Sequence, residues 1–296
     1  MTALSRDRQA AEVQYAVSRL TDPEEIRSLL EPEKAYAAYA LAQLEARLFG
    51  LSDWYVGTSA GSRALVVHSR SGLGHALFAI GDKDALDAVL SLHPGPRFTF
   101  ASLRLEHRAV VEKYFLMTRP QIMLRMSVAE QAFSPVSGPA ERLDAGRVAA
   151  INRLYSSEGG PTAYQPGHLE DGVYYGVFED GTLVSIAGTH VVSASEGIAV
   201  VGNVFTHPSR RGRGLATIAT SAVTAHLLQV CPLVVLTVEA ANDPAVAIYS
   251  RLGYEPQCTL HETPLIRKEP LGVLSAARRL VAGWRGRHEG KEIVAG

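Results

Sequence analysis

The stretch His207–Thr217, "HPSRRGRGLAT", places three arginines and two glycines between a proline and an apolar segment with helical periodicity. The first turn of a helix has backbone N–H groups without partners, and the aligned peptide dipoles add about half a positive charge there. Gly212 and Gly214 permit positive φ angles just before this helix, so that successive N–H groups can converge on one anion. Arg211 and Arg213 can add charge-assisted contacts. The stretch therefore predicts a phosphate-binding site, and its length suits a diphosphate.

Two common phosphate-binding motifs do not fit this stretch. A P-loop has a lysine and then Ser or Thr after its last glycine, whereas Leu215 and Ala216 follow Gly214. The dinucleotide fingerprint needs a third glycine where this chain has Thr217, and it needs a parallel βαβ unit. The strand before this loop instead ends a predicted three-stranded meander, so Mg-nucleotides and dinucleotides are both disfavoured.

The overall composition is that of a globular protein without a general affinity for polyanions. The 296 residues are 47% hydrophobic and 20% charged, with a formal net charge of −1. With so little net charge, no long-range field draws the chain to nucleic acid or to an acidic membrane. No segment approaches the ~18 apolar residues of a membrane span, and the N-terminus lacks the apolar core of a signal peptide. We expect a cytoplasmic protein that binds neither membrane nor nucleic acid.

The two cysteines, Cys231 and Cys258, lie beside segments that are expected to be buried strands. One disulfide remains open, but two free thiols in a reducing compartment are favoured. No metal site is predicted.

Both halves of the chain show the same predicted order: helix, three strands, helix, strand, helix, strand. The first fifty residues have helical periodicity, clearest over residues 33–49. Two tandem copies of one unit explain this order most simply. The stretch Ser134–Glu141, with two prolines and a glycine, is predicted to be a linker. We therefore expect domains at residues 1–136 and 137–268.

A helix and tail follow at residues 269–296. The helix is amphipathic, and we expect it to dock on the protein rather than on a membrane surface. Its apolar side is formed by Leu271, Val273, Leu274, Leu280 and Val281.

A second motif follows the arginine-glycine stretch at Asn242–Tyr254, "NDPAVAIYSRLGY". An alanine lies three residues after the asparagine and a tyrosine seven residues after it, before Leu-Gly-aromatic. With "VFTHPSRRGRGLA" at residues 204–216, this motif resembles the signature of the GNAT superfamily of acyl-CoA-dependent N-acyltransferases. The resemblance covers roughly Leu143–Ile266, and the N-terminal half resembles a degenerate copy with "AIGDKDAL" in place of "RRGRGLAT". It implies an α+β fold of two tandem GNAT-like units, each a mixed, mostly antiparallel sheet flanked by helices.

The resemblance implies acetyl-CoA as the co-substrate, with its pantetheine arm between two splayed parallel strands at residues 201–206 and 233–238. Asn242 matches the position that contacts this arm near the thiol. Backbone groups of the first strand would pair with the pantetheine amides, and the loop and first helical turn would hold the pyrophosphate. The residues implied are Val204, Phe205 and Thr206 for the pantetheine, and Arg211, Gly212, Arg213, Gly214, Leu215, Ala216 and Thr217 for the pyrophosphate.

The resemblance also implies the chemistry, which is direct attack of a neutral amine on the thioester in a ternary complex. Tyr249 matches the tyrosine that acts as general acid on the departing sulfur, and a strand N–H near Val204 would stabilise the oxyanion. The general base remains open, because Thr237 stands where many members have a glutamate. Glu239 and His190 are the candidates, and ordered water is a third route. Asn203 is a neutral polar group beside the site.

The amine acceptor cannot be identified from these residues, and a small molecule or a peptide amine both fit. The stretch 159–171, "GGPTAYQPGHLED", corresponds to the part of relatives that shapes the acceptor pocket. Tyr164 and His168 are candidates to line it, with a surface loop as the alternative. A homodimer is also left open.

Three other functions compete with acyl transfer. "GTSAG" at Gly57–Gly61 matches the nucleophile elbow of serine hydrolases, but Ser59 is followed by a predicted strand rather than a helix. A non-catalytic CoA-binding sensor or interaction module fits the missing glutamates and not the intact Tyr249. Nucleic-acid binding through "RRGR" would need a broad basic face with aromatic residues, which the sequence does not show.

Overall fold

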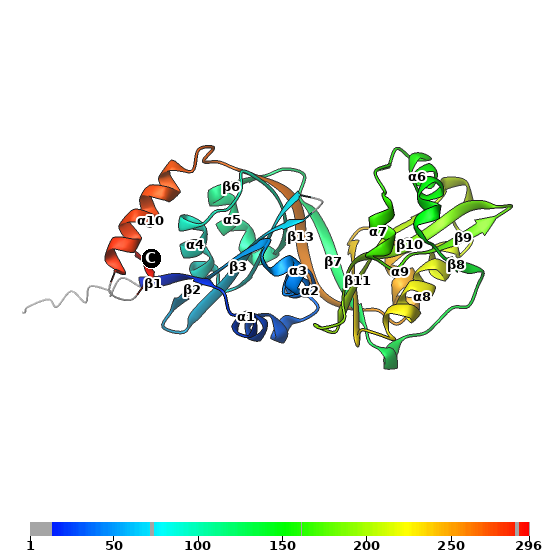
Figure 1. The fold of residues 1–296 in the computed structure, drawn as a ribbon, viewed down its shortest axis with the longest axis horizontal. Coiled ribbons are helices and arrows are strands. Elements are labelled where there is room, and N and C mark those ends of the chain that lie inside the picture. The colour runs from blue at the N-terminus through cyan, green and yellow to red at the C-terminus, as the bar shows by residue number, and fades with distance from the viewer. Residues whose placement is uncertain (1–13, 72–73, 161, 288–289, 296) are drawn as a thin grey trace, which may run out of the picture. The chain divides into compact units, whose positions relative to one another are not determined.

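The structure, a computed structural model, describes residues 14–71, 74–160, 162–287 and 290–295 (Figure 1). The chain folds into two compact units, and each unit is assembled from separate stretches of sequence. Unit 1 comprises residues 1–26, 52–120 and 263–296, and unit 2 comprises residues 27–51 and 121–262. This division differs from the linear boundaries expected at residues 136 and 268, because the chain passes between the units more than once.

Unit 1 contains a sheet with the order β14-β1-β2-β3-β4-β5, in which β4 and β5 are parallel and the other described pairs are antiparallel. Its core lies between the strands and helix α4, and includes Val66, Leu86 and Leu103. The elements of unit 1 are β1 Gln14–Leu20, β2 Ser52–Ser59, β3 Ser62–Ser71, β4 Gly74–Gly81, α4 Lys83–Leu92, β5 Phe98–Arg104, η2 Leu105–His107, α5 Arg108–Tyr114, β6 Phe115–Met117, α10 Val273–Arg285 and β14 Glu292–Ala295.

Two predictions in this unit have opposite outcomes. Residues 14–20, which were expected to be helical, form the strand β1, in which Tyr15 and Val17 are buried in the core of unit 1. The turn at "GTSAG" joins β2 directly to β3, with Ser59 opposite Ser62. This hairpin confirms the turn and lacks the strand-to-helix bend that a nucleophile elbow requires.

Unit 2 contains a sheet with the order β13-β7-β12-β11-β10-β9-β8. Strands β11 and β12 are parallel, and the other described pairs are antiparallel. The elements are η1 Glu31–Glu33, α2 Ala38–Ala42, α3 Ala46–Phe49, β7 Gln121–Val128, η3 Glu130–Ala132, β8 Ala140–Arg142, η4 Ala145–Arg147, α6 Val148–Ser156, α7 Pro166–Glu170, β9 Tyr175–Glu179, β10 Thr182–Ser193, β11 Ile198–Thr206, η5 Pro208–Arg210, α8 Leu215–Leu227, β12 Leu233–Glu239 and α9 Asp243–Arg251. Helix α1, Pro23–Leu30, contributes residues to both units, as does strand β13, Glu255–Arg267.

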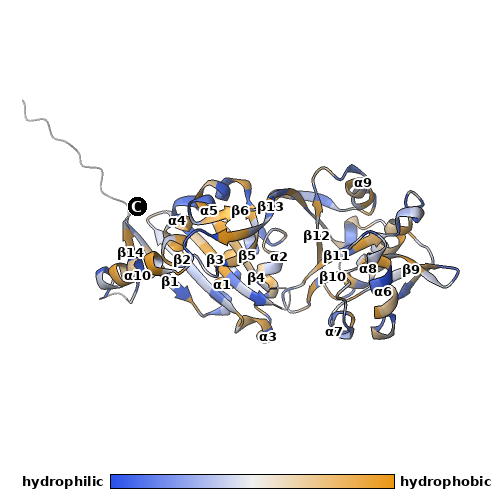
Figure 2. Ribbon diagram, turned by 90° about the horizontal axis from the view of Figure 1, so that it is seen from above, coloured by the Kyte–Doolittle hydropathy of each residue, from blue (hydrophilic) through white to orange (hydrophobic). Residues whose placement is uncertain are grey.

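The sheet of unit 2 has two apolar faces, each covered by helices, and its central strands are rich in hydrophobic residues (Figure 2). Leu236 of β12 packs with Val223 of α8 and with Tyr249 of α9 on one face, which we name the α8 face. Ile186 of β10 packs with Leu154 of α6 on the other, which we name the α6 face. A two-residue turn at Asp180 and Gly181 joins β9 to β10, with positive φ at both residues.

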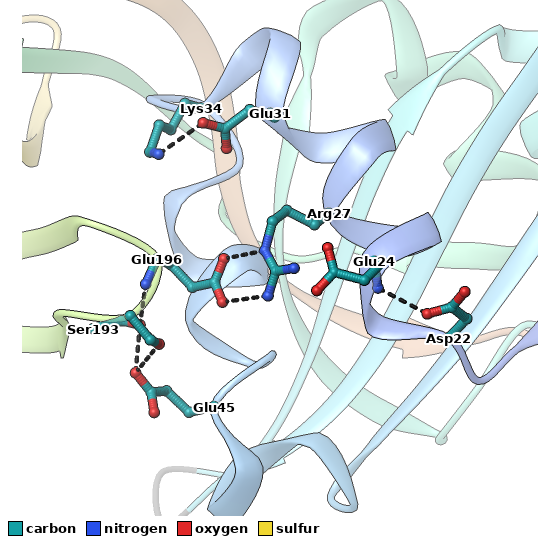
Figure 3. A network of polar contacts seen from close by, with 9 residues as sticks. Asp22, Glu24, Arg27, Glu31, Lys34, Glu45, Ser193 and Glu196 are labelled. Carbon is teal, nitrogen blue, oxygen red and sulfur yellow. Dashed lines mark hydrogen bonds and ion pairs between the residues drawn. The ribbon is translucent and has the colours of Figure 1, made fainter.

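Residues 27–51 were expected in the N-terminal domain, but they pack on unit 2. Arg27 donates two hydrogen bonds of 2.8 Å to the buried carboxylate of Glu196, in the turn after β10 (Figure 3). Glu45 accepts hydrogen bonds from Ser193 at 2.6 Å and from Ser195 at 2.8 Å, and these bonds lower the pKa of Glu45. Charge-assisted bonds to partly buried groups are the stronger kind, so this segment is anchored at a defined place on unit 2.

Two strands exchange between the halves of the sequence. Strand β7 comes from the first half of the chain and lies between β12 and β13 in the sheet of unit 2. Strand β13 pairs with β7 over residues 255–262 and with β6 over residues 265–267. Each unit therefore needs a strand from the other half to complete its sheet.

Helix α10 forms as predicted, but its apolar side does not face the protein. The helix contacts α4 and β14, and its buried side chains include Ser275 and Ala282. The side chains that were expected on its apolar side are all exposed, together with Trp284: Leu271, Val273, Leu274, Leu280 and Val281. The helix docks on unit 1 through its small residues. None of the described helices has both the length and the apolar character that a membrane span needs.

A buried histidine makes the stability of unit 1 sensitive to acid. His68 of β3 is 7% exposed, and its Nε2 lies 2.9 Å from the carbonyl of His93, to which the neutral ring can donate. Burial lowers the pKa of His68 to about 4. Above the ordinary value of about 6.5 the ring is neutral in both folded and unfolded chains. As the pH falls from that value towards 4, the unfolded chain binds the proton first, and the folded state loses stability.

We predict that His68→Gln loses less stability in acid than the wild type does. A shift of this size corresponds to roughly 3 kcal/mol between pH 7 and pH 4. Urea unfolding at pH 7 and pH 4 measures the difference, and His75→Gln, at an exposed position of β4, is the matched control. Equal losses for His68→Gln and the wild type would contradict the assignment.

Candidate functional site

The parallel strands of unit 2 part in the middle of their length. The last pair between them is Val201 of β11 with Leu236 of β12. Strand β11 continues to Thr206 and keeps its pairing with β10, and β12 continues to Glu239 and keeps its pairing with β7. Beyond the last pair, the facing edges of β11 and β12 have no strand partner in the described part of the chain, as the resemblance implied for residues 201–206 and 233–238.

Asn203 lies at the point where the strands part, in a bulge of β11. Its φ is +54°, and three steps on β11 oppose two on β10 here. The Tyr155 hydroxyl donates a 2.7 Å hydrogen bond to the Asn203 carbonyl. The Asn203 amide donates to the Tyr174 hydroxyl at 3.3 Å and to the Thr189 carbonyl at 3.2 Å. The side chain expected beside the reacting groups is thus engaged in holding the bulge, which turns the strand away from its neighbour.

The arginine-glycine loop has the backbone conformation that a phosphate nest requires. Gly212 and Gly214 have φ angles of +75° and +78°, and no atom lies within 4 Å of the position a Cβ would take at either residue. Gly214 is the N-cap of α8, and no side chain caps this helix. The corresponding helix of unit 1, α4, is capped by Asp82, whose carboxylate accepts from the backbone N–H groups of Asp84 and Ala85. The Asp82 carboxylate thus occupies the N-terminus of α4, whereas no side chain occupies the equivalent position at α8.

The arginines of the loop form ion pairs with nearby carboxylates. Arg211 donates to Glu158 and also, at 3.2 Å, to the carbonyl of Thr206. Arg213 lies 2.8 Å from Glu179. All of these pairs involve exposed side chains or exposed arginines, where ion pairs contribute little stability. An anion of higher charge can therefore displace the carboxylates.

Helix α9 positions the two residues of the second motif. Asn242 is its N-cap, and the Asn242 side chain accepts a 3.2 Å hydrogen bond from the backbone N–H of Ala245. Tyr249 is 8% exposed on the α8 face, and burial raises its pKa to about 12. Its ring lies edge-on to Tyr254, with ring centres 6.1 Å apart. Within the described residues the Tyr249 hydroxyl forms no hydrogen bond, so it stays protonated and available as a donor.

The candidate bases lie on the α6 face, beyond the point where the strands part. Side chains alternate along β12, so Thr237 and Glu239 face away from the α8 face to which Leu236 and Val238 belong. Glu239 is exposed at the end of the strand. The ring of His190 lies over Gly202 of β11, where an added Cβ would come within 2.0 Å of it.

The environment of His190 favours the neutral ring. The side chain is exposed, yet the surrounding protein limits its hydration, and this desolvation lowers its pKa, with a further lowering by the charge of Arg125. Its ring centre lies 6.2 Å from that of Tyr39, on α2. A neutral imidazole can accept a proton, so His190 and Glu239 both remain candidates for the base.

Tyr164 and His168 lie beside one another in an aromatic cluster on the α6 face. Tyr164 stacks on Tyr155 at 5.1 Å between ring centres, and its hydroxyl donates to the Tyr155 hydroxyl at 3.3 Å. Tyr164 also lies edge-on to Tyr174 and to His168. His168 caps α7 by accepting from the backbone N–H of Gln165. Tyr155 belongs to this cluster and also donates to the Asn203 carbonyl. A shift of the Tyr155 ring would therefore move both the cluster and the bulge.

Two residues of this region are not found by the sequence reasoning. Arg125 of β7 is fully buried, and its guanidinium carbon lies 5.1 Å from the centre of the Tyr39 ring. An arginine within the apolar run "QIMLRMSV" is itself a signal, because charged residues are almost never fully buried without a partner. Tyr39 carries no such signal, since residues 27–51 were expected to belong to the other domain. Cys231 and Cys258 are free thiols, as predicted.

We predict that Gly202→Ala displaces the His190 ring. The new methyl group would overlap the imidazole, which we expect to cost about 1–3 kcal/mol of stability. As the ring moves away from the protein, the pKa of His190 should rise towards its ordinary value. NMR titration and thermal unfolding measure both effects. Gly50→Ala is the control, since no atom lies within 4 Å of its Cβ position. An unchanged His190 titration would show that the ring does not depend on Gly202.

Comparison with known proteins finds a family model that matches part of unit 2. Residues 147–254 match the model of the Acetyltransferase (GNAT) family. No curated protein matches the chain. Among solved structures, a Drosophila protein is similar with a TM-score of 0.59 and 14% identity, over 86% of this chain and 98% of that one.

Two GNAT acetyltransferases are similar over nearly the whole chain. One, from Colwellia psychrerythraea, has a TM-score of 0.52 and 12% identity, over 84% of this chain and 98% of its own. The other is a GCN5-related N-acetyltransferase from Sphaerobacter thermophilus, with a TM-score of 0.52 and 15% identity, over 86% and 95%. At such identities the likeness shows the fold alone, and it extends over both units. The expected α+β fold, with a mixed, mostly antiparallel sheet and flanking helices in each unit, is confirmed, and residues 147–254 match the GNAT family model.

Proposed function

We propose that the protein is an N-acetyltransferase that moves an acetyl group from acetyl-CoA to an amine by direct attack in a ternary complex. The observation that carries this proposal is the parting of β11 and β12 beside an uncapped helix N-terminus. The first feature offers unpaired strand edges to a chain with amide groups, and the second offers N–H groups to a diphosphate. Acyl-CoA carries both groups in one molecule.

The residues present fit acyl-CoA on the α8 face. The edge of β11 at Val204, Phe205 and Thr206 would pair with the pantetheine amides. The backbone of residues 211–217 would hold the pyrophosphate, supported by the open space at Gly212 and Gly214. Arg211 and Arg213 would exchange their carboxylate partners for phosphate oxygens. Asn242, at the start of α9, would stay beside the cofactor arm.

Acetyl-CoA supplies the activated acyl group, and Tyr249 assists the departure of its sulfur. The amine nitrogen forms a bond to the thioester carbon, the carbon–sulfur bond breaks, and coenzyme A leaves with the electron pair. With a pKa of about 12, the Tyr249 phenol is protonated at neutral pH and can donate its hydrogen to the sulfur. The burial that holds the phenol neutral also disfavours a free thiolate, which promotes the proton transfer.

The amine must lose a proton, and its acceptor would lie on the α6 face. Glu239 can receive it through a water molecule, and His190 can receive it on its neutral ring. A strand N–H near Val204 would stabilise the negative charge on the carbonyl oxygen. In this proposal the cofactor binds from the α8 face of the parted strands, and the amine binds from the α6 face.

We predict that Gly214→Glu abolishes acetyl-CoA binding, because a carboxylate would occupy the nest that the diphosphate needs. The affinity should fall by more than about 100-fold, since one anion would exclude the other. Calorimetry with acetyl-CoA measures it. Gly61→Glu is the matched control: Gly61 has φ of +88° and equally open surroundings, but it lies in the β2–β3 turn of unit 1. Unchanged affinity of Gly214→Glu would refute the phosphate site.

We predict that Tyr249→Phe lowers turnover by about 100-fold, the usual effect of a lost general acid, and leaves acetyl-CoA affinity almost unchanged. Release of free thiol from acetyl-CoA in the presence of an amine panel measures turnover. Tyr254→Phe is the control, because it removes a buried hydroxyl bonded at 2.7 Å to Thr224 and should affect stability alone. A wild type that binds acetyl-CoA and releases no thiol with any amine would be a sensor and not an enzyme.

A further inference from the structure

Arg125 is a buried cation that the fold itself does not neutralise. Its side chain is 0% exposed, and its Nε and Nη1 groups form no hydrogen bond. Among the described residues no ion pair involves Arg125. A charge buried in this way opposes folding unless it is paired, and structures seldom keep one without a use. The Tyr39 ring attracts the guanidinium through a cation–π contact, but this contact does not supply hydrogen-bond acceptors for the Nε–H and Nη1–H groups.

A second unused polar group lies directly beside Arg125. Thr237 is its register partner on β12, so the two side chains point to the same face of the sheet. The Thr237 Oγ1 is also buried and has no hydrogen-bond partner. Buried polar groups are nearly always satisfied, and two neighbouring exceptions indicate an absent ligand rather than two separate defects.

The position of this pair matches the place where an amine would react. Thr237 is the first residue on the α6 face of β12 after the last pair with β11. His190, whose pKa responds to the charge of Arg125, lies over Gly202, the first β11 residue past that pair. A molecule held by Arg125 and Thr237 would therefore lie next to the gap between the strands.

We propose that the amine acceptor carries a carboxylate, and that Arg125, assisted by the Thr237 hydroxyl, binds this carboxylate. This inference rests on the proposed acyl transfer and names the substrate class: an amino acid or another small amine with an acidic group. The guanidinium offers at least two free N–H donors, and the hydroxyl offers a third, which together match the lone pairs of one carboxylate. Binding would satisfy three buried groups at once.

The preference is tested with pairs of acceptors that differ only in charge. Thiol release from acetyl-CoA is measured with a panel of free amino acids and with the amides of the same amino acids. We expect kcat/KM for the preferred acid to exceed that for its amide by about 100-fold, because the amide leaves buried donors unpaired. Equal rates for acid and amide, or a preference for a phosphorylated amine, would overturn the proposal.

The role of Arg125 is tested by Arg125→Met, with Arg153→Met as the matched control. Arg153 is an exposed arginine on α6. We expect Arg125→Met to reduce kcat/KM for the acid to the level of the amide, while acetyl-CoA affinity is retained. Its melting temperature should not fall, because the substitution removes an unpaired buried charge. Arg153→Met should behave as the wild type.

Binding measured without turnover separates this inference from the proposed function. The free acid should raise the melting temperature of the wild type and of Arg153→Met, and not that of Arg125→Met. If no amine releases thiol but this Arg125-dependent binding persists, the acyl transfer is wrong and the carboxylate site stands. If Arg125→Met loses stability and acetyl-CoA affinity together, Arg125 is a structural residue and the carboxylate site is refuted.

Discussion

The candidate site depends on the point at which two parallel strands stop pairing. One residue in a left-handed conformation, Asn203, turns β11 away from β12, and the hydroxyls of Tyr155 and Tyr174 hold it there. A continuous sheet would have closed this gap with its own hydrogen bonds. Because the pairing stops after Val201 and Leu236, the facing edges of β11 and β12 do not hydrogen-bond to each other beyond that point. The gap between them opens from one face of the sheet to the other. The cofactor proposal and the acceptor proposal both require this opening.

The two units differ in how the helix between their parallel strands is capped. In both units a helix connects two parallel strands, α4 between β4 and β5, and α8 between β11 and β12. Asp82 gives α4 an internal carboxylate, which stabilises the helix and occupies its N-terminal N–H groups. Gly214 gives α8 no such group. Helix α8 therefore lacks the stability that a capping side chain contributes, and its first N–H groups are not occupied by a capping side chain.

Local patterns were sufficient for the arginine-glycine loop and for the helices α8 and α9 that carry the two motifs. The positive φ angles at Gly212 and Gly214 follow from the chemistry of glycine, and the tyrosine of α9 follows from motif spacing. What could not be predicted depends on contacts between distant segments. The sequence of β7 is typical of a strand of the first half of the chain, and its local pattern does not indicate that it pairs with β12. The arginine within this apolar run is a local signal, but its place beside Thr237 of β12 follows only from this long-range pairing.

Amphipathic patterns were also misleading for two elements of unit 1. Helix α10 has a clear apolar side, and the rule that such a side is buried fails there because the helix uses Ser275 and Ala282 instead. The helical expectation for β1 is wrong because its sequence, QYAVSRL, does not alternate strictly between polar and apolar residues. Burial in both cases is decided by tertiary packing.

The exchange of strands has a consequence for the order in which the protein is made. Residues of unit 1 near the start of the chain cannot complete their sheet until residues 263–267 and 292–295 have been synthesised, after all of unit 2. During synthesis, the first strands of unit 1 therefore emerge before the strands that pair with them. Until those later strands are made, the edge of β1 stays unpaired. The two halves are obliged to mature together, and a cut between them would leave neither with an intact sheet.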